Sequence, residues 1–152
     1  MSEVNARLEL LLPVMMECLE SGHSFTFSPK GVSMLPMLKE GRDTVTLSPI
    51  CGELRKYDLP LYRRPDGKFI LHRVVETGAS YTCVGDNQFQ LEKGVDPSWC
   101  IAVVTSFCRN GKEYRSDQLS YRIYCVLWHR TRRLRWFWSR GVHKLERIFG
   151  IR

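Results

Sequence analysis

Three short stretches of the sequence carry polar residues whose types suit nucleophilic catalysis. The stretches GVSMLP, ILHRVV and VGDNQ contribute Ser33, His72 and Asp86, in that order along the chain. A serine hydroxyl becomes an effective nucleophile at neutral pH when a base lies within hydrogen-bond reach and a carboxylate orients that base. Histidine suits the role of base because its ordinary pKa, about 6.5, lies near neutral pH. The three stretches therefore predict a serine–histidine–acid site.

The residues around Ser33 favour a rigid turn that presents its hydroxyl. Gly31 allows close approach of the backbone, and Pro36 stiffens the turn. The main-chain N–H of Ser33 is then a candidate donor to the oxyanion that forms on an attacked carbonyl.

The sequence around His72 favours a strand, because apolar and β-branched residues surround it. Alternation along a strand predicts that its side chain faces away from those of Leu71 and Arg73. Each of the three polar residues also has a purely structural interpretation. Ser33 could be a turn serine, Asp86 an Asx-turn former and His72 a hydrogen-bonded strand histidine.

The three stretches, in this order, resemble motifs of the serine-peptidase superfamily that unites signal peptidases with LexA-type self-cleaving repressors. GVSMLPMLKEGRDTVTL is similar to the box that holds the nucleophile, KYDLPLYRRPDGKFILHRVV to the box that holds the general base, and VGDNQ to the Gly-Asp-Asn box. Together they cover most of residues 24–105. His72-Arg73 matches the histidine form of the second box, found in the endoplasmic-reticulum and archaeal type of signal peptidase.

The resemblance implies roles for particular residues. Ser33 would be the nucleophile, His72 the general base and Met34 a wall of the substrate pocket. Gly31 stands where many signal peptidases have a serine that donates to the oxyanion, so backbone donors would have to suffice. The acid that orients the base is expected to be Asp86 first, with two alternatives further along the chain, Glu92 and Asp96.

The elements that must position these residues form a mainly-β fold of short strands and hairpins with N- and C-terminal helices, as in the signal-peptidase/LexA-like fold. We expect an amphipathic helix within 1–22, a peptidase-like β domain over 23–117 and a basic, aromatic helical segment over 118–152. Asp66-Gly67 predicts a hairpin between strands at 60–64 and 68–75, and Asn110-Gly111 predicts another.

The positive charge of the chain is concentrated at its C-terminal end. Lys and Arg number 23 against 16 Asp and Glu, and residues 120–152 hold nine of these cations against one acid, Glu146. This segment also carries an aromatic stripe at helical spacing that includes Tyr124 and Trp128. It could pack on the β body, lie in a lipid interface, or bind nucleic acid. We expect no nucleic-acid partner, and a peripheral membrane contact through residues 120–152 remains an alternative to packing on the β body.

The six cysteines include no C-x-x-C pair, so we expect neither a zinc site nor any other cofactor. No run of about 20 apolar residues predicts a membrane span, and no export signal is evident, so a cytoplasmic location is expected. The leading hypothesis is a serine endopeptidase that cleaves an extended peptide or protein precursor after a small residue, through an acyl-enzyme. The alternatives are a catalytically idle peptide-binding or membrane-surface module of the same fold, and a basic nucleic-acid-associated protein.

Overall fold

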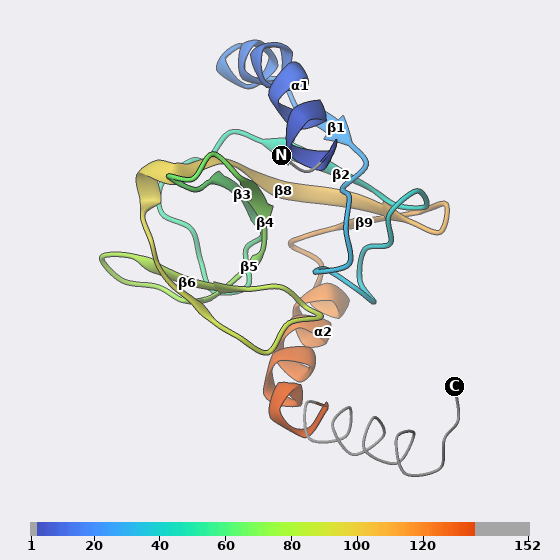
Figure 1. The fold of residues 1–152 in the computed structure, drawn as a ribbon. Helices are drawn as coiled ribbons and strands as arrows, with labels where there is room; N and C mark the ends of the chain where they lie inside the picture. The colour runs from blue at the N-terminus through green and yellow to red at the C-terminus, as the bar shows by residue number, and fades with distance from the viewer. Residues whose placement is uncertain (1–2, 136–152) are drawn as a thin grey trace, which may run out of the picture.

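A helix stands at each end of a β body in the computed structural model, which describes residues 3–135 (Figure 1). The elements are α1 (Glu3–Glu20), β1 (Phe25–Phe27), β2 (Thr44–Ser48), β3 (Pro60–Arg63), β4 (Phe69–Leu71), β5 (Arg73–Glu76), β6 (Tyr81–Val84), β7 (Glu92–Val95), the short 3-10 helix η1 (Pro97–Trp99), β8 (Cys100–Arg109), β9 (Lys112–Arg115) and α2 (Leu119–Arg130). The expected mainly-β fold with N- and C-terminal helices is confirmed. The part of the expected basic segment beyond residue 135 lies outside the described residues.

Helix α1 ends where the sequence predicts, at a glycine that adopts a left-handed conformation. Gly22 has φ +76°, its N–H donates to the carbonyl of Leu19, and the N–H of His23 donates to that of Cys18. This paired arrangement satisfies the last carbonyls of the helix. Leu19 and Met15 of α1 are buried against the β body, so the helix caps one end of the core.

The larger sheet has the order β1-β2-β8-β3-β4, and β9 pairs with the C-terminal part of β8, from Ser106 to Arg109. All of these pairings are antiparallel. The β8–β9 hairpin turns at Asn110 (φ +51°) and Gly111 (φ +77°), the pair of positive angles that a two-residue turn of this type requires. This hairpin confirms the prediction made from the Asn-Gly pair.

The smaller sheet has the order β5-β6-β7, and His72 is the single residue between β4 of the larger sheet and β5 of the smaller one. The single strand expected over 68–75 is therefore wrong: β4 stops at Leu71, and the chain enters β5 at Arg73. The predicted alternation fails for the same reason, because His72 and Arg73 are both buried as the chain passes from one sheet to the other.

Two apolar clusters form the core. The larger one joins α1, the 31–38 loop, the larger sheet and α2. The smaller one lies where the two sheets meet and contains Tyr62 of β3, Val74 of β5 and Cys83 of β6. Burial raises the pKa of the Cys83 thiol to about 12, so this side chain behaves as an apolar group.

Helix α2 lies at the opposite end of the β body from α1 (Figure 1). Its inner face buries Tyr121 and Cys125 in the larger cluster, with Tyr124 half-buried beside them. Within residues 3–135, no helix combines the length and the apolar character that crossing a bilayer requires.

Candidate active site

Ser33 and His72 line the same cavity, although one comes from the loop between β1 and β2 and the other from the junction of the two sheets. The cavity has a volume of about 320 Å³. Its walls are mixed, with apolar side chains that include Met34, Leu61 and Phe69 and with the cations Lys30, Arg64 and Lys68. A hydroxyl and an imidazole at one cavity are the groups that acyl transfer requires.

His72 is held on one side by a phenol and a carboxylate. Its Nδ1 lies 3.5 Å from the hydroxyl of Tyr62 and 3.6 Å from Oε2 of Glu92. The Tyr62 hydroxyl in turn donates a hydrogen bond of 2.7 Å to the same oxygen of Glu92. The imidazole is only 5% exposed, so this contact fixes a buried ring. With Nδ1 turned toward Glu92, Nε2 is the ring nitrogen that has no contact with this carboxylate.

The carboxylate of Glu92 stays ionised at neutral pH. Burial acts to raise its pKa, but the polar contacts from His72, Arg64 and Tyr62 outweigh burial and hold the pKa well below its ordinary value. The guanidinium of Arg64 donates to both carboxylate oxygens. A negative charge beside Nδ1 favours the tautomer that carries its proton there.

The structure changes the order of the candidate acids, because Asp86 has another partner. Both oxygens of its buried carboxylate accept hydrogen bonds of 2.8 Å from Arg73, and Oδ2 also accepts from the hydroxyl of Tyr124 at 3.2 Å. Arg73 is 1% exposed, and a buried guanidinium needs a carboxylate partner. Asp86 supplies that partner, and Glu92 is the carboxylate that the structure brings to His72.

Asp96, the remaining alternative, is exposed and caps η1. Its Oδ1 accepts hydrogen bonds from the N–H of Ser98 at 2.8 Å and from the hydroxyl of Ser98 at 2.7 Å. These bonds lower the pKa of Asp96, as expected for a carboxylate at a helix N-cap. It does not line the cavity that contains Ser33 and His72.

The Gly-Asp-Asn stretch holds the loop that carries Ser33. The N–H of Asn87 donates to the carbonyl of Ser33 at 2.8 Å, and the side-chain amide of Asn87 donates to the carbonyl of Val32 at 3.1 Å. Gly85 lies so close that a Cβ there would come within 2.6 Å of the Ser33 carbonyl oxygen. The first and third stretches therefore meet through their backbones, and only glycine fits at position 85.

The backbone N–H groups of Gly31 and Ser33, the candidate donors to an oxyanion, differ in whether they already make a hydrogen bond. The N–H of Gly31 donates to Glu40 at 2.8 Å, so that amide is already paired. Among residues 3–135, neither the N–H nor the hydroxyl of Ser33 makes a hydrogen bond. The Ser33 amide is thus the backbone donor that remains open. Met34 is 4% exposed and forms part of the cavity wall, as the resemblance implies.

Arg73 joins all three motif stretches to α2. Besides its ion pair with Asp86, Nη2 lies 2.9 Å from the sulfur of Met37 in the loop after Ser33. Nη1 donates to the hydroxyl of Tyr121 in α2 at 2.7 Å. The residue after His72 therefore organises the buried side of the site, while His72 itself faces the cavity.

Sequence reasoning missed three residues that support the site. Tyr62 and Arg64 reach Glu92 from β3 and the turn after it, and nothing in their spacing signals this, since the contact depends on how the two sheets meet. Asp43 is fully buried and accepts hydrogen bonds from the N–H groups of Lys39 and Asn110. It ties the loop after Ser33 to the β8–β9 turn. For Asp43, the signal available in the sequence was the position of an acidic residue directly before a strand.

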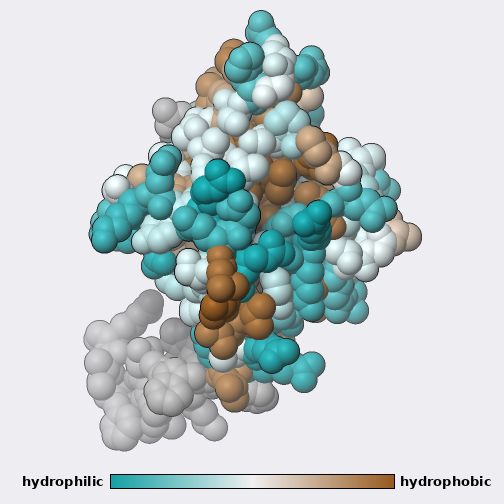
Figure 2. Space-filling view, turned by 180° about the vertical axis from the view of Figure 1, so that it is seen from behind, coloured by the Kyte–Doolittle hydropathy of each residue, from teal (hydrophilic) through white to brown (hydrophobic). Residues whose placement is uncertain are grey.

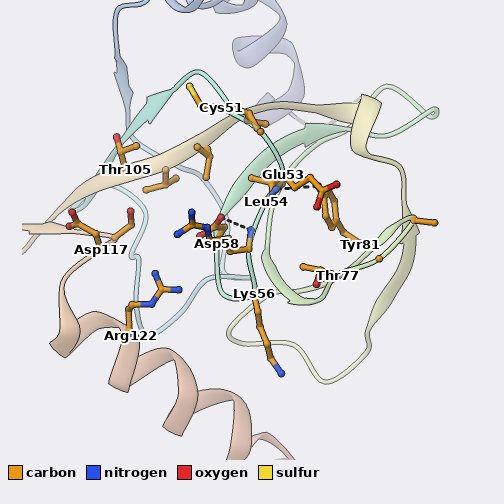
Figure 3. Close-up of a pocket in the computed structure, with 18 residues that line it drawn as sticks. Cys51, Glu53, Leu54, Lys56, Asp58, Thr77, Tyr81, Thr105, Asp117 and Arg122 are labelled. Carbon is orange, nitrogen blue, oxygen red and sulfur yellow. Dashed lines mark hydrogen bonds between the residues drawn. The ribbon is translucent and has the colours of Figure 1, made fainter.

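The largest hollow of the described surface lies elsewhere and is not the candidate site. It has a volume of about 1160 Å³ and is rimmed by charged side chains that include Asp58, Asp117 and Arg122 (Figure 3). Its lining contains neither Ser33 nor His72.

Comparison of the chain with protein-family models, curated proteins and solved structures yields no match. Within residues 3–135, no group of three or more His, Cys, Asp or Glu side chains could hold a metal ion.

Proposed function

We propose that this protein is a serine endopeptidase in which Ser33 is the nucleophile, His72 the general base and Glu92 the carboxylate that orients it. The observation that carries the proposal is the cavity shared by Ser33 and His72, with Glu92 on the far side of the imidazole. The resemblance of the three stretches to signal-peptidase motifs adds to it.

The chemistry would follow the serine–histidine pattern. The Ser33 hydroxyl attacks the carbonyl of the scissile bond while Nε2 of His72 takes its proton, and the resulting oxyanion accepts a hydrogen bond from the Ser33 N–H. The imidazolium then passes its proton to the leaving amine. Water, deprotonated by His72, hydrolyses the acyl-enzyme and frees Ser33. Glu92 remains ionised throughout and stabilises the imidazolium.

An extended peptide is the substrate that the surroundings of the cavity favour. Strand β4 is the outermost strand at one edge of the larger sheet, and its residues Phe69, Ile70 and Leu71 line the cavity directly before His72. A peptide added to this edge would place its backbone along the cavity and its side chains against the apolar residues of the wall. Cleavage after a small residue is what the resemblance implies.

A cytoplasmic location belongs to the same proposal. Its support is the set of six cysteines, which are free thiols in the structure. Protein thiols are kept reduced in the cytosol.

The proposal is tested by incubating the purified protein with a mixed peptide library and following cleavage by mass spectrometry. Ser33→Ala should abolish cleavage without changing the thermal midpoint, because the Ser33 hydroxyl bonds to no described residue. The matched control is Ser80→Ala, at an exposed turn serine outside the cavity, which should cleave at the wild-type rate. Cleavage that persists in Ser33→Ala would exclude this nucleophile.

A further inference from the structure

The outer face of α2 carries a stripe of exposed apolar side chains. Leu119, Ile123 and Leu127 are 74%, 50% and 58% exposed, and Leu134 beyond the helix is 70% exposed. Residues four apart lie on one face of a helix, so the first three form a continuous row. Figure 2 shows apolar side chains gathered at this end of the molecule. Such a row on a helix marks a surface that contacts something apolar.

Arginines flank the stripe, and α2 itself contains no acid. Arg130 and Arg133 are exposed and Arg122 is half-buried, while the sequence from 118 to 135 contains no Asp or Glu. Asp117, just before the helix, lies near Arg122. The surface therefore combines aliphatic side chains with an excess of cations over acids. This combination is complementary to an apolar layer covered by anionic groups.

The inner face of α2 fixes the direction in which the stripe points. Tyr121 accepts a hydrogen bond from Arg73, and the indole N–H of Trp128 donates to the carbonyl of Asp86 at 2.8 Å. Tyr124 donates to the carboxylate of Asp86. Since these bonds hold the polar-aromatic face against the body, α2 cannot rotate to bury Ile123 and Leu127 without breaking them.

We propose that the outer face of α2 docks on the surface of an anionic lipid bilayer, with its aliphatic side chains in the acyl boundary and its arginines at the headgroups. The aliphatic character decides between lipid and nucleic acid. Nucleic acid bases stack on aromatic rings, whereas leucine and isoleucine have no π-face and would stay in water beside a phosphate backbone. In a bilayer the same side chains leave water, and each arginine gains from the negative surface potential. The inference does not rest on the proposed peptidase activity.

The test is co-sedimentation of the full chain with vesicles of phosphatidylcholine alone and of phosphatidylcholine mixed with phosphatidylglycerol. The wild type should sediment with the mixed vesicles and stay in solution with the neutral ones. Ile123→Ser/Leu127→Ser should lower the partition coefficient about tenfold or more. Arg130→Gln/Arg133→Gln should lower it by about fivefold for each arginine.

The matched control is Leu10→Ser/Val14→Ser, which removes two exposed apolar side chains from α1 and should bind mixed vesicles as the wild type does. All four sites are exposed, so circular dichroism melts should coincide. The proposal is overturned if the α2 apolar variant and the α1 control bind equally. It is also overturned if the chain binds an oligonucleotide and no vesicle, or if the α2 substitutions dissolve a dimer while vesicle binding is absent.

Discussion

Arg73 and Asp86 form a buried two-point ion pair directly behind the cavity of Ser33 and His72. Both side chains are 2% exposed, so neither charge is compensated by water. Since Arg73 follows His72 and Asp86 lies within the Gly-Asp-Asn stretch, the pair links the segment of His72 to the stretch that contacts the Ser33 loop. Its role is to fix the arrangement of these segments, and the charge beside the imidazole comes from Glu92.

Asp86→Asn should therefore destabilise the fold strongly. Removing one partner leaves the Arg73 charge buried without compensation, at a cost of about 3–5 kcal/mol. Urea unfolding measures this loss. The matched control is Asp117→Asn, whose ion pair with Arg115 is exposed on both sides and whose loss should change the free energy of unfolding little. Equal effects of the two substitutions would contradict a buried structural role for Asp86.

Glu92→Gln should lower catalysis, and it should also lower stability because it removes the ion pair with Arg64. The neutral amide can still bond Tyr62, but it removes the negative charge 3.6 Å from Nδ1 of His72. We expect kcat/KM for peptide cleavage to fall about 100-fold or more. Asp96→Asn is the control, because that acid only caps η1. If Asp96→Asn lowered kcat/KM and Glu92→Gln did not, the assignment of the orienting acid would be wrong.

Gly85→Ala should displace Ser33. The added methyl group would lie 2.6 Å from the Ser33 carbonyl oxygen, which is too close to tolerate, and 3.1 Å from the Ser33 Cβ, which is tight. We expect a loss of about 1–3 kcal/mol in the free energy of unfolding, together with a fall in cleavage rate. At Gly78 a methyl group would meet nothing nearer than 3.8 Å. Gly78→Ala should leave both quantities near those of the wild type, and a similar loss there would show that steric pressure on Ser33 is not the cause.

The stabilising effect of Asp43 should depend on pH in a defined window. Hydrogen bonds, first of all from Arg42, lower the pKa of Asp43 to about 2, below the ordinary value of about 3.9 in an unfolded chain. The ionised carboxylate therefore stabilises the fold fully above about pH 4, and this contribution disappears as the pH falls toward 2.

Urea unfolding of the wild type and Asp43→Asn between pH 2 and 6 measures the effect. At pH 6 the free energy of unfolding of the wild type should exceed that of Asp43→Asn by roughly 2 kcal/mol. This difference should shrink below pH 4. A difference that stays constant across this range would contradict the stated role of the charge.

Local sequence patterns predicted the individual helices, strands and turns better than they predicted where these elements contact one another. The helix ending at Ser21-Gly22 and the turn at Asn110-Gly111 depend on the conformations of one or two residues, so their sequence signals are strong. The break at His72 has no such signal. The run from Phe69 to Glu76 favours a strand throughout, and only the assembly of two sheets decides where it divides.

The candidate acids show the same limit. Asp86 follows a strand and lies in a turn, which made it the first candidate from spacing and resemblance. In the structure Asp86 instead pairs with Arg73, because a buried guanidinium needs a carboxylate partner. Arg73 is buried because α2 packs against it, and this packing has no signal in the local sequence. Glu92 reaches His72 because β7 pairs with β6 in one sheet while Tyr62 and Arg64 approach from the other.

The most direct measurement of the proposed catalytic pair is a double-mutant cycle on peptide cleavage. Residues that act as one unit lose their effect together, so Ser33→Ala, His72→Ala and the double variant should each lower kcat/KM by the same factor, about 1,000-fold or more. Thermal melts of all three confirm that the fold is retained. Losses that multiply in the double variant, or a wild-type rate in either single variant, would contradict a Ser33–His72 mechanism.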